Sequence, residues 1–216
     1  MSEKYLVVSW VAFVQQLQHL IARGYEEYCV VSYPEKKEDK FEKIDRKLIS
    51  KYNANLDKDK SYYRKKKKIC NFKFLRFGNQ AIILKTKGKI EEGVVVDDTF
   101  KHVKKEKMVI PIGDKASLSI GYDNEKKVSV FMTKEMYREV KYTCFEYIDA
   151  KKFVKAIEAF NRLNALPSWG GIVEQKINMK QQIERHLQKA LSKESALELA
   201  KKMKVNTKRT AIKVFV

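Results

Sequence analysis

The sequence has few of the residues on which many catalytic and structural motifs depend. Its 216 residues include eight glycines, three prolines, three cysteines and three histidines. There is no glycine-rich phosphate loop, which excludes a nucleotide hydrolase of the P-loop type. His19, His102 and His186 lack the spacing of a metal-binding pair. We therefore predict no metal site and no cofactor.

The cysteines and the apolar segments indicate the cellular compartment of the protein. Cys29, Cys70 and Cys144 are odd in number and far apart, so they indicate neither a disulfide framework nor a zinc site. Isolated cysteines of this kind favour a reducing, intracellular compartment, either cytoplasmic or associated with a nucleoid or nucleus. The apolar N-terminal segment lacks the basic region of a signal peptide. No apolar run reaches the roughly 18 residues of a membrane span, and we expect no membrane partner.

One stretch lacks charges of one sign. Residues 60–89 contain eleven Lys or Arg and neither Asp nor Glu, in a chain whose net charge is +19. The excess lies in two blocks, residues 60–107 and 151–216, each with 15 basic and 5 acidic residues. Residues 108–150, with six basic and seven acidic, are nearly neutral. Charge separated in this way favours a polyanionic partner, which for most proteins is nucleic acid.

Lysines, which number 38 against eight arginines, account for most of this charge. Lysine neutralises phosphate as a point charge, whereas arginine supplies the planar fork that reads guanine edges. The composition therefore predicts salt-sensitive binding to the nucleic-acid backbone with little base reading. A lysine excess also arises by drift in an A/T-rich coding sequence, so a general solubility role is the competing interpretation.

Local patterns predict an α+β fold with a central antiparallel sheet, a meander of about five strands, between N-terminal helices and a helical C-terminal third. The expected helices are 10–23 with Ser9 as cap, 38–52, one after Thr133 (where 139–148 also tolerates a strand), one capped by Asp149, 172–191, and one after Ser192. The expected strands are 28–33, 71–77, 80–87, 108–112, 117–122 and 127–132, with a tight turn at Gly78-Asn79. The break at 166–171 predicts a core domain over 1–166 that carries a basic hairpin, and a basic helical extension over 167–216.

The basic run is the first candidate nucleic-acid site. Tyr62 and Tyr63 would stack on bases from a polar, flexible segment. Phe72, Phe74 and Phe77 would either stack from an exposed sheet surface or belong to the core, and we favour the core. The basic cluster is also compatible with a nuclear import signal. The cations expected to neutralise phosphates are Lys60, Arg64, Lys65, Lys66, Lys67, Lys68, Arg76, Lys85, Lys87 and Lys89.

The C-terminal block is the second candidate. Residues 196–215 have the outline of a helix-turn-helix, with a turn at 204–206 and a reading helix from Thr207 to Phe215. This outline favours DNA over RNA, although Lys204 stands where the turn usually has glycine. The alternative is a surface helix followed by a tail strand. The cations of this second contact are Lys201, Lys202, Lys204, Lys208 and Arg209.

These patterns predict a non-enzymatic nucleic-acid-binding protein that acts in replication, processing or mobilisation, alone or in a larger nucleoprotein complex. One alternative is a metal-dependent nuclease, since two acidic pairs bracket a predicted strand at Val94–Val96 and would hold Mg²⁺ beside the basic run. These acids are Glu91, Glu92, Asp97 and Asp98. A second alternative is a basic subunit that docks on acidic surfaces of a protein assembly.

Overall fold

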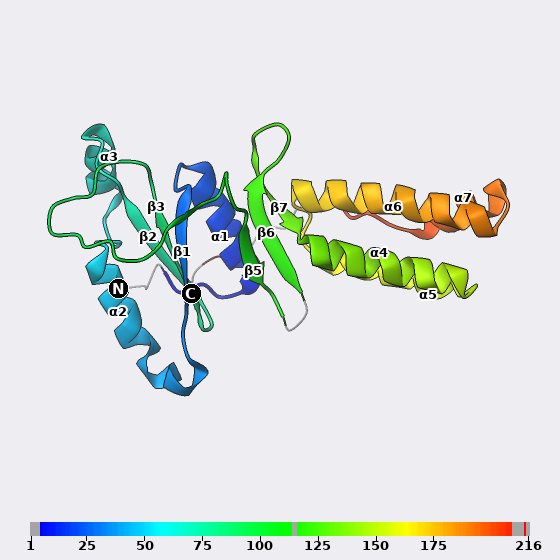
Figure 1. Ribbon diagram of the computed structural model, residues 1–216, viewed down its shortest axis with the longest axis horizontal. Coiled ribbons are helices and arrows are strands. Elements are labelled where there is room, and N and C mark those ends of the chain that lie inside the picture. Colours follow the sequence, from blue (N-terminus) through cyan, green and yellow to red (C-terminus); the bar gives the residue numbers. More distant parts are fainter. Residues whose placement is uncertain (1–4, 114–115, 209–213, 215–216) are drawn as a thin grey trace. The chain divides into compact units, whose positions relative to one another are not determined.

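The computed structural model describes residues 5–113, 116–208 and 214. This part of the chain contains seven α-helices and two antiparallel sheets, which confirms the α+β class (Figure 1). The expected meander is divided, because its strands belong to a four-stranded sheet in the order β2-β3-β1-β4 and a three-stranded sheet in the order β5-β6-β7.

The helices are α1 (Trp10–Ala22), α2 (Phe41–Lys51), α3 (Lys58–Lys66), α4 (Lys134–Asp149), α5 (Phe153–Asn161), α6 (Gly170–Ala190) and α7 (Lys193–Lys202), with short 3-10 helices η1 (Glu35–Lys40) and η2 (Arg162–Ala165). The strands are β1 (Glu27–Ser32), β2 (Phe72–Phe77), β3 (Gln80–Lys85), β4 (Lys101–His102), β5 (Met108–Pro111), β6 (Ser117–Tyr122) and β7 (Val128–Met132). No helix in the described ranges combines the length and apolar character needed to cross a membrane.

The chain forms two compact units. The first comprises Met1–Met108, Ile120–Val128 and Ile212–Val216, and the second comprises Val109–Ser119 and Ser129–Ala211. The chain passes between them within β5, β6 and β7.

The first unit is built on the four-stranded sheet. Strand β1 pairs antiparallel with both β3 and β4, and β3 pairs with β2 in a hairpin whose last pair is Phe77 with Gln80. The turn between them is the predicted one, and Gly78 adopts the positive φ of +56° that such a turn favours. The hairpin contributes the largest share of the buried sheet residues, so it serves as the base on which the neighbouring helices pack.

Helices α1 and α2 cover opposite faces of this hairpin. On one face the ring of Phe13 lies 6.1 Å from that of Phe77, and on the other the ring of Tyr52 lies 5.1 Å from that of Phe72. Successive side chains of a strand point to opposite faces, so the alternation in β2 produces the two layers. Phe72 and Phe74 are 1% and 4% exposed. The core interpretation is therefore confirmed for Phe72 and Phe74, whereas Phe77 is half-buried beside Phe13.

The second unit contains a bundle of four helices. Helix α4 contacts α5 and α6, and α7 contacts the same two helices (Figure 1). Thr133 and Ser192 cap α4 and α7, as predicted, by accepting hydrogen bonds from backbone N–H groups. The strand alternative at 139–148 is wrong. The expected cap at Asp149 is also wrong, because this residue ends α4 and its carboxylate lies 2.8 Å from His186.

The segment after α7 runs beside α5 and η2 and is held there by side chains. Asn161 donates to the carbonyl of Lys202 (3.2 Å) and accepts from the N–H of Lys204 (2.9 Å). Asn164 repeats this pattern, two residues further along the segment, with the carbonyl of Lys204 (2.9 Å) and the N–H of Asn206 (3.1 Å). Ser168 donates to the carbonyl of Asn206 (2.8 Å). We call this set of contacts the amide ladder.

Candidate nucleic-acid interface

The segment expected to be flexible is helix α3. Asp57 caps it by accepting a hydrogen bond from the N–H of Lys60 at 2.7 Å. The last turn carries Arg64, Lys65 and Lys66. Cations at this end are stabilised by the partial negative charge of the helix C-terminus. Residues 58–66 thus form a regular helix that the sequence patterns did not predict, and Tyr62 and Tyr63 are exposed on it.

Arg64 anchors α3 to the sheet and is only 8% exposed. Its guanidinium group forms an ion pair with Glu91 and donates to the carbonyl of Cys70 at 3.0 Å. The side chain of Asn71 adds a second tie by donating to the carbonyl of Ser61 at 2.9 Å. Arg64 thus positions the helix and does not face a partner, unlike the lysines that follow it.

Helix α3 ends in a Schellman motif. The N–H of Lys68 donates to the carbonyl of Lys65 (3.1 Å), and the N–H of Ile69 donates to the carbonyl of Arg64 (3.0 Å). Lys68 occupies the position that glycine usually takes and has a φ of +56°. The motif turns the chain sharply, so that Lys67 and Lys68 stay at the end of the helix.

Gly88 brings the second part of the basic run against this helix end. The N–H of Lys89 donates to the carbonyl of Lys68 (2.8 Å), and the N–H of Cys70 donates to the carbonyl of Lys89 (2.9 Å). A Cβ atom on Gly88 would lie 2.5 Å from the backbone nitrogen of Cys70, closer than real Cβ contacts. Only glycine permits this approach, which places Lys89 beside the end of α3 although Lys89 lies 23 residues after Lys66 in sequence.

The resulting surface combines exposed lysines with exposed aromatic rings. Tyr62 and Tyr63 are 56% and 63% exposed, with ring centres 5.9 Å apart, and the Nζ of Lys66 lies 4.8 Å from the ring centre of Tyr62. Among the lysines of this surface, only Lys60 takes part in an ion pair found in the described residues, with Asp57 at 3.7 Å. We call this set the α3 surface: Lys60, Tyr62, Tyr63, Lys65, Lys66, Lys67, Lys68, Lys87 and Lys89.

Two other predicted cations are used inside the first unit. The Nε of Arg76 lies 2.8 Å from a carboxylate oxygen of Asp45, a residue with no exposed surface. Lys85 forms a 2.8 Å ion pair with Glu27 and is 15% exposed. Both cations stabilise the sheet and lie outside the α3 surface.

The four candidate metal-binding acids are not brought together. Glu91 is paired with Arg64, whereas Asp97 and Asp98 are paired with Lys51. A hydrogen bond from the Tyr52 hydroxyl, followed by the hydrogen bond and the charge of Lys51, holds the pKa of Asp98 below its ordinary value.

The surroundings of these acids also differ from the prediction. Residues 94–96 are not a strand, which corrects the prediction. Glu92 is exposed at the start of this segment. Within the part of the chain that the structure describes, no group of three or more His, Cys, Asp or Glu is placed to hold a metal ion.

The C-terminal cations belong to the second unit. Lys201 and Lys202 end α7, and Lys204 and Lys208 are exposed in the segment that follows. Thr207 and Lys208 are not helical, so the expected reading helix does not begin where it was predicted. Arg209 lies outside the described residues.

A further polar surface was not predicted. Lys134 and Arg138 on α4 and Arg185 on α6 are all exposed and line one groove in the second unit. The sequence spacing of these residues could have indicated this surface. Lys134 and Arg138 are four residues apart, and the polar residues of α6 recur at helical intervals, which places each set on one helix face. No residue of the polar helix predicted at 172–191 was expected to form a site, because the polar face of a helix usually contacts only solvent.

Comparison with known proteins finds no match: no family model, no curated protein and no solved structure matches this chain. A proposal for its function therefore depends on its own surface chemistry.

Proposed function

We propose that this protein binds nucleic acid through the α3 surface. The observation that carries the proposal is a cluster of exposed lysines together with two exposed tyrosines, and of these lysines only Lys60 has an ion pair in the described residues. Like charges held this close repel one another, and a polyanion relieves the repulsion. An acidic protein would neutralise the lysines, but it would not supply bases that stack on the two adjacent exposed rings.

The two kinds of side chain have different tasks. The lysines neutralise backbone phosphates as point charges, so they give affinity without sequence preference. Tyr62 and Tyr63 offer ring faces on which unpaired bases stack, and such stacking is tolerant of sequence. Bases in a duplex are already stacked, so the tyrosines favour single-stranded segments. The α3 surface itself has no feature that separates DNA from RNA.

A charge-matched pair of variants tests this proposal. In the first variant Lys66, Lys67, Lys87 and Lys89 become Gln, and in the control Lys36, Lys37, Lys40 and Lys43 become Gln. All eight lysines are exposed in the first unit, and both variants lose the same charge. On single strands each lost phosphate contact lowers the slope of log affinity against log salt by about 0.7, so four lost contacts lower it by about 3. The control retains the wild-type slope.

The measurement is fluorescence anisotropy with single-stranded and duplex DNA and RNA of equal length, at several salt concentrations and with or without Mg²⁺. Equal slopes for the two quadruple variants would overturn the α3 surface as the contact. Weak binding of the wild type to all four nucleic acids would overturn the proposal and favour the acidic protein partner. Shortening of the oligonucleotide only with Mg²⁺ would point to the nuclease alternative.

The tyrosines are tested separately. Replacing both by Ala removes stacking that is worth about 1–3 kcal/mol per base, which lowers single-strand affinity by at least about 10-fold. Replacement by Phe keeps the rings and therefore keeps the affinity. Duplex affinity changes little in either variant. If the Ala variant binds single strands as the wild type does, the rings do not stack on bases.

A further inference from the structure

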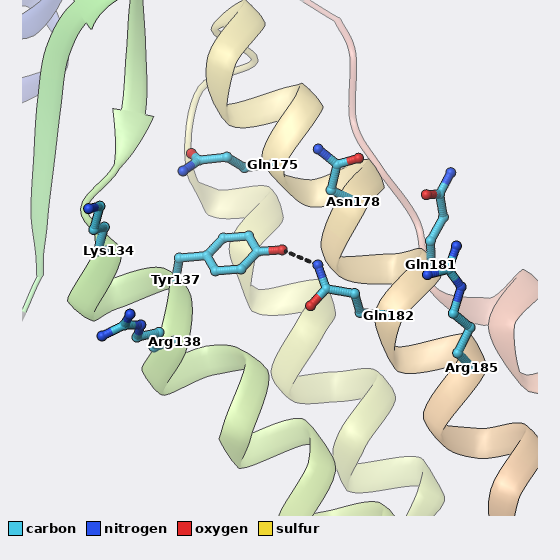
Figure 2. Close-up of a pocket in the computed structure, with 8 residues that line it drawn as sticks. All are labelled: Lys134, Tyr137, Arg138, Gln175, Asn178, Gln181, Gln182 and Arg185. Atoms are coloured by element: carbon cyan, nitrogen blue, oxygen red, sulfur yellow. Dashed lines mark hydrogen bonds between the residues drawn. The ribbon is translucent and has the colours of Figure 1, made fainter.

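The second unit contains a groove between α4 and α6 with a volume of about 440 Å³ (Figure 2). This volume falls in the range of pockets that bind small organic ligands. The groove is lined by three cations, four amide side chains and one tyrosine, without a carboxylate. Its walls therefore present positive charge and hydrogen-bonding groups to anything that enters.

Part of the lining is fixed by internal contacts. The side chain of Gln175 accepts from the N–H of Met132 (2.7 Å) and donates to its carbonyl (3.1 Å). The amide of Gln182 donates to the hydroxyl of Tyr137 at 3.0 Å, the dashed contact in Figure 2. The Tyr137 hydroxyl still has its own hydrogen to donate. These contacts hold the floor of the groove in shape.

The remaining lining is exposed. Lys134 and Arg138 come from α4, and Asn178, Gln181 and Arg185 come from α6 (Figure 2). No ion pair found in the described residues involves the three cations. Lys134 and Arg138, four residues apart on one helix, repel each other, and an anion in the groove would remove that cost.

The chemistry of this lining differs from that of the α3 surface. Two of the eight arginines of the chain line this groove, whereas Arg64 and Arg76 are used in ion pairs. The arginine fork binds phosphate or a guanine edge with two parallel hydrogen bonds. Asn and Gln present one donor and one acceptor, the pattern that pairs with the edge of a base. Phosphate and base recognition are therefore available within one groove.

We infer that this groove binds a nucleotide unit of the nucleic-acid strand and gives the protein a base preference that the α3 surface lacks. Arg138 and Arg185 read the base with their forks, and Asn178 and Gln181 hydrogen-bond to the rest of the nucleotide unit. This inference rests on the proposed function for its ligand. It concerns other residues in another unit, so its failure can be distinguished from failure of the proposed function.

The test compares four homopolymeric single-stranded pentanucleotides with an abasic strand of the same length. NMR chemical shifts of the backbone amides of α4 and α6 and of the side-chain amides of Asn178 and Gln181 report occupancy of the groove. We expect the best base to bind about 10-fold more tightly than the worst, since one well-placed pair discriminates at least 5-fold. The abasic strand should bind weakest at the groove.

The decisive variant is Arg138→Lys with Arg185→Lys, which keeps both charges and removes both forks. We expect it to lose the base preference while its affinity for the abasic strand stays within about 2-fold, because charge supplies that affinity. The matched control replaces Arg23 and Arg46, exposed arginines of the first unit, by Lys and keeps the preference.

The outcomes separate the two proposals. Equal shifts with all five strands, or no shift in α4 and α6, would overturn the groove as a base-reading site. A base preference that survives in the double Lys variant would overturn the arginine assignment. Neither result bears on the α3 surface, whose failure shows instead as equal salt slopes for its two quadruple variants.

Discussion

The buried amine of Lys176 gives a prediction about stability. Lys176 lies on the core stripe of α6, in line with Ile172, Met179 and Ile183, and it has no exposed surface. Its Nζ has no hydrogen-bond partner among the described residues. Burial lowers the pKa of this amine from its ordinary 10.5 to about 8. The folded protein therefore holds a charged group at neutral pH in a place that disfavours the charge.

The magnitude follows from the shift. One pKa unit corresponds to about 1.4 kcal/mol, so the charged form costs the folded state about 3 kcal/mol below pH 8. Between pH 8 and 10.5 the unfolded chain keeps this proton while the folded chain releases it, so this contribution to stability rises with pH. Met, which is also unbranched, fills a similar space without charge. Lys176→Met is therefore expected to raise the free energy of unfolding by about 3 kcal/mol at pH 7 and by progressively less toward pH 10.

Urea unfolding followed by circular dichroism at pH 7, 8, 9 and 10 measures this difference. The comparison with the wild type at each pH is essential, since burial raises the pKa of Cys144 to about 11, and that group makes stability fall as pH rises. Lys189→Met, an exposed change on the same helix, should alter stability by less than about 0.5 kcal/mol. A loss of stability in Lys176→Met at pH 7, or a difference independent of pH, would refute the reasoning.

Three further predictions concern the first unit, with Lys151 of the second unit as a matched control for the first of them. Lys68→Gly and Lys151→Gly each replace a lysine at positive φ (+56° and +57°), so each should add about 1 kcal/mol to the free energy of unfolding, but only the first should lower the salt slope of nucleic-acid binding. Gly88→Ala should destabilise by about 2 kcal/mol, measured by urea unfolding, because its Cβ would meet backbone atoms of the opposing segment; unchanged stability would show that the segments separate easily. Asp45→Asn leaves the Arg76 charge without its buried partner and should cost about 3 kcal/mol by the same measurement, whereas a cost below about 1 kcal/mol would mean that Arg76 reaches solvent.

Helices and turns with strong local signals could be predicted from the sequence. Ser9, Thr133 and Ser192 cap the helices predicted to follow them, and Gly78-Asn79 forms the predicted hairpin turn. Helix α3 was missed because it has no apolar stripe. Its stability comes from the Asp57 cap and from long-range contacts of the buried Arg64. The pattern of hydrophobic spacing contains neither signal.

The sequence predicted the positive charge of the candidate site, but it did not predict which of the cations are exposed. The exposed lysines of α3 followed from the absence of acids in the basic run, but the loss of Arg64, Arg76 and Lys85 to ion pairs did not. Each of these cations meets an acid at least 27 residues away in sequence, and only the folded register brings the two together. The groove in the second unit required knowledge of which polar faces of α4 and α6 meet, which helical spacing alone does not give.

The amide ladder has a mechanical consequence for the segment after α7. The segment and the residues that hold it run in the same direction, since Asn161 contacts Lys202 and Lys204 while Ser168 contacts Asn206. A pull along the tail therefore loads the rungs together, as in shear, and not one after another, as in peeling. Force that reaches the chain from its C-terminal side is shared among several hydrogen bonds before it reaches α7. The ladder would thus act as a strain relief for the helical bundle if the protein is held under tension by a long polymer.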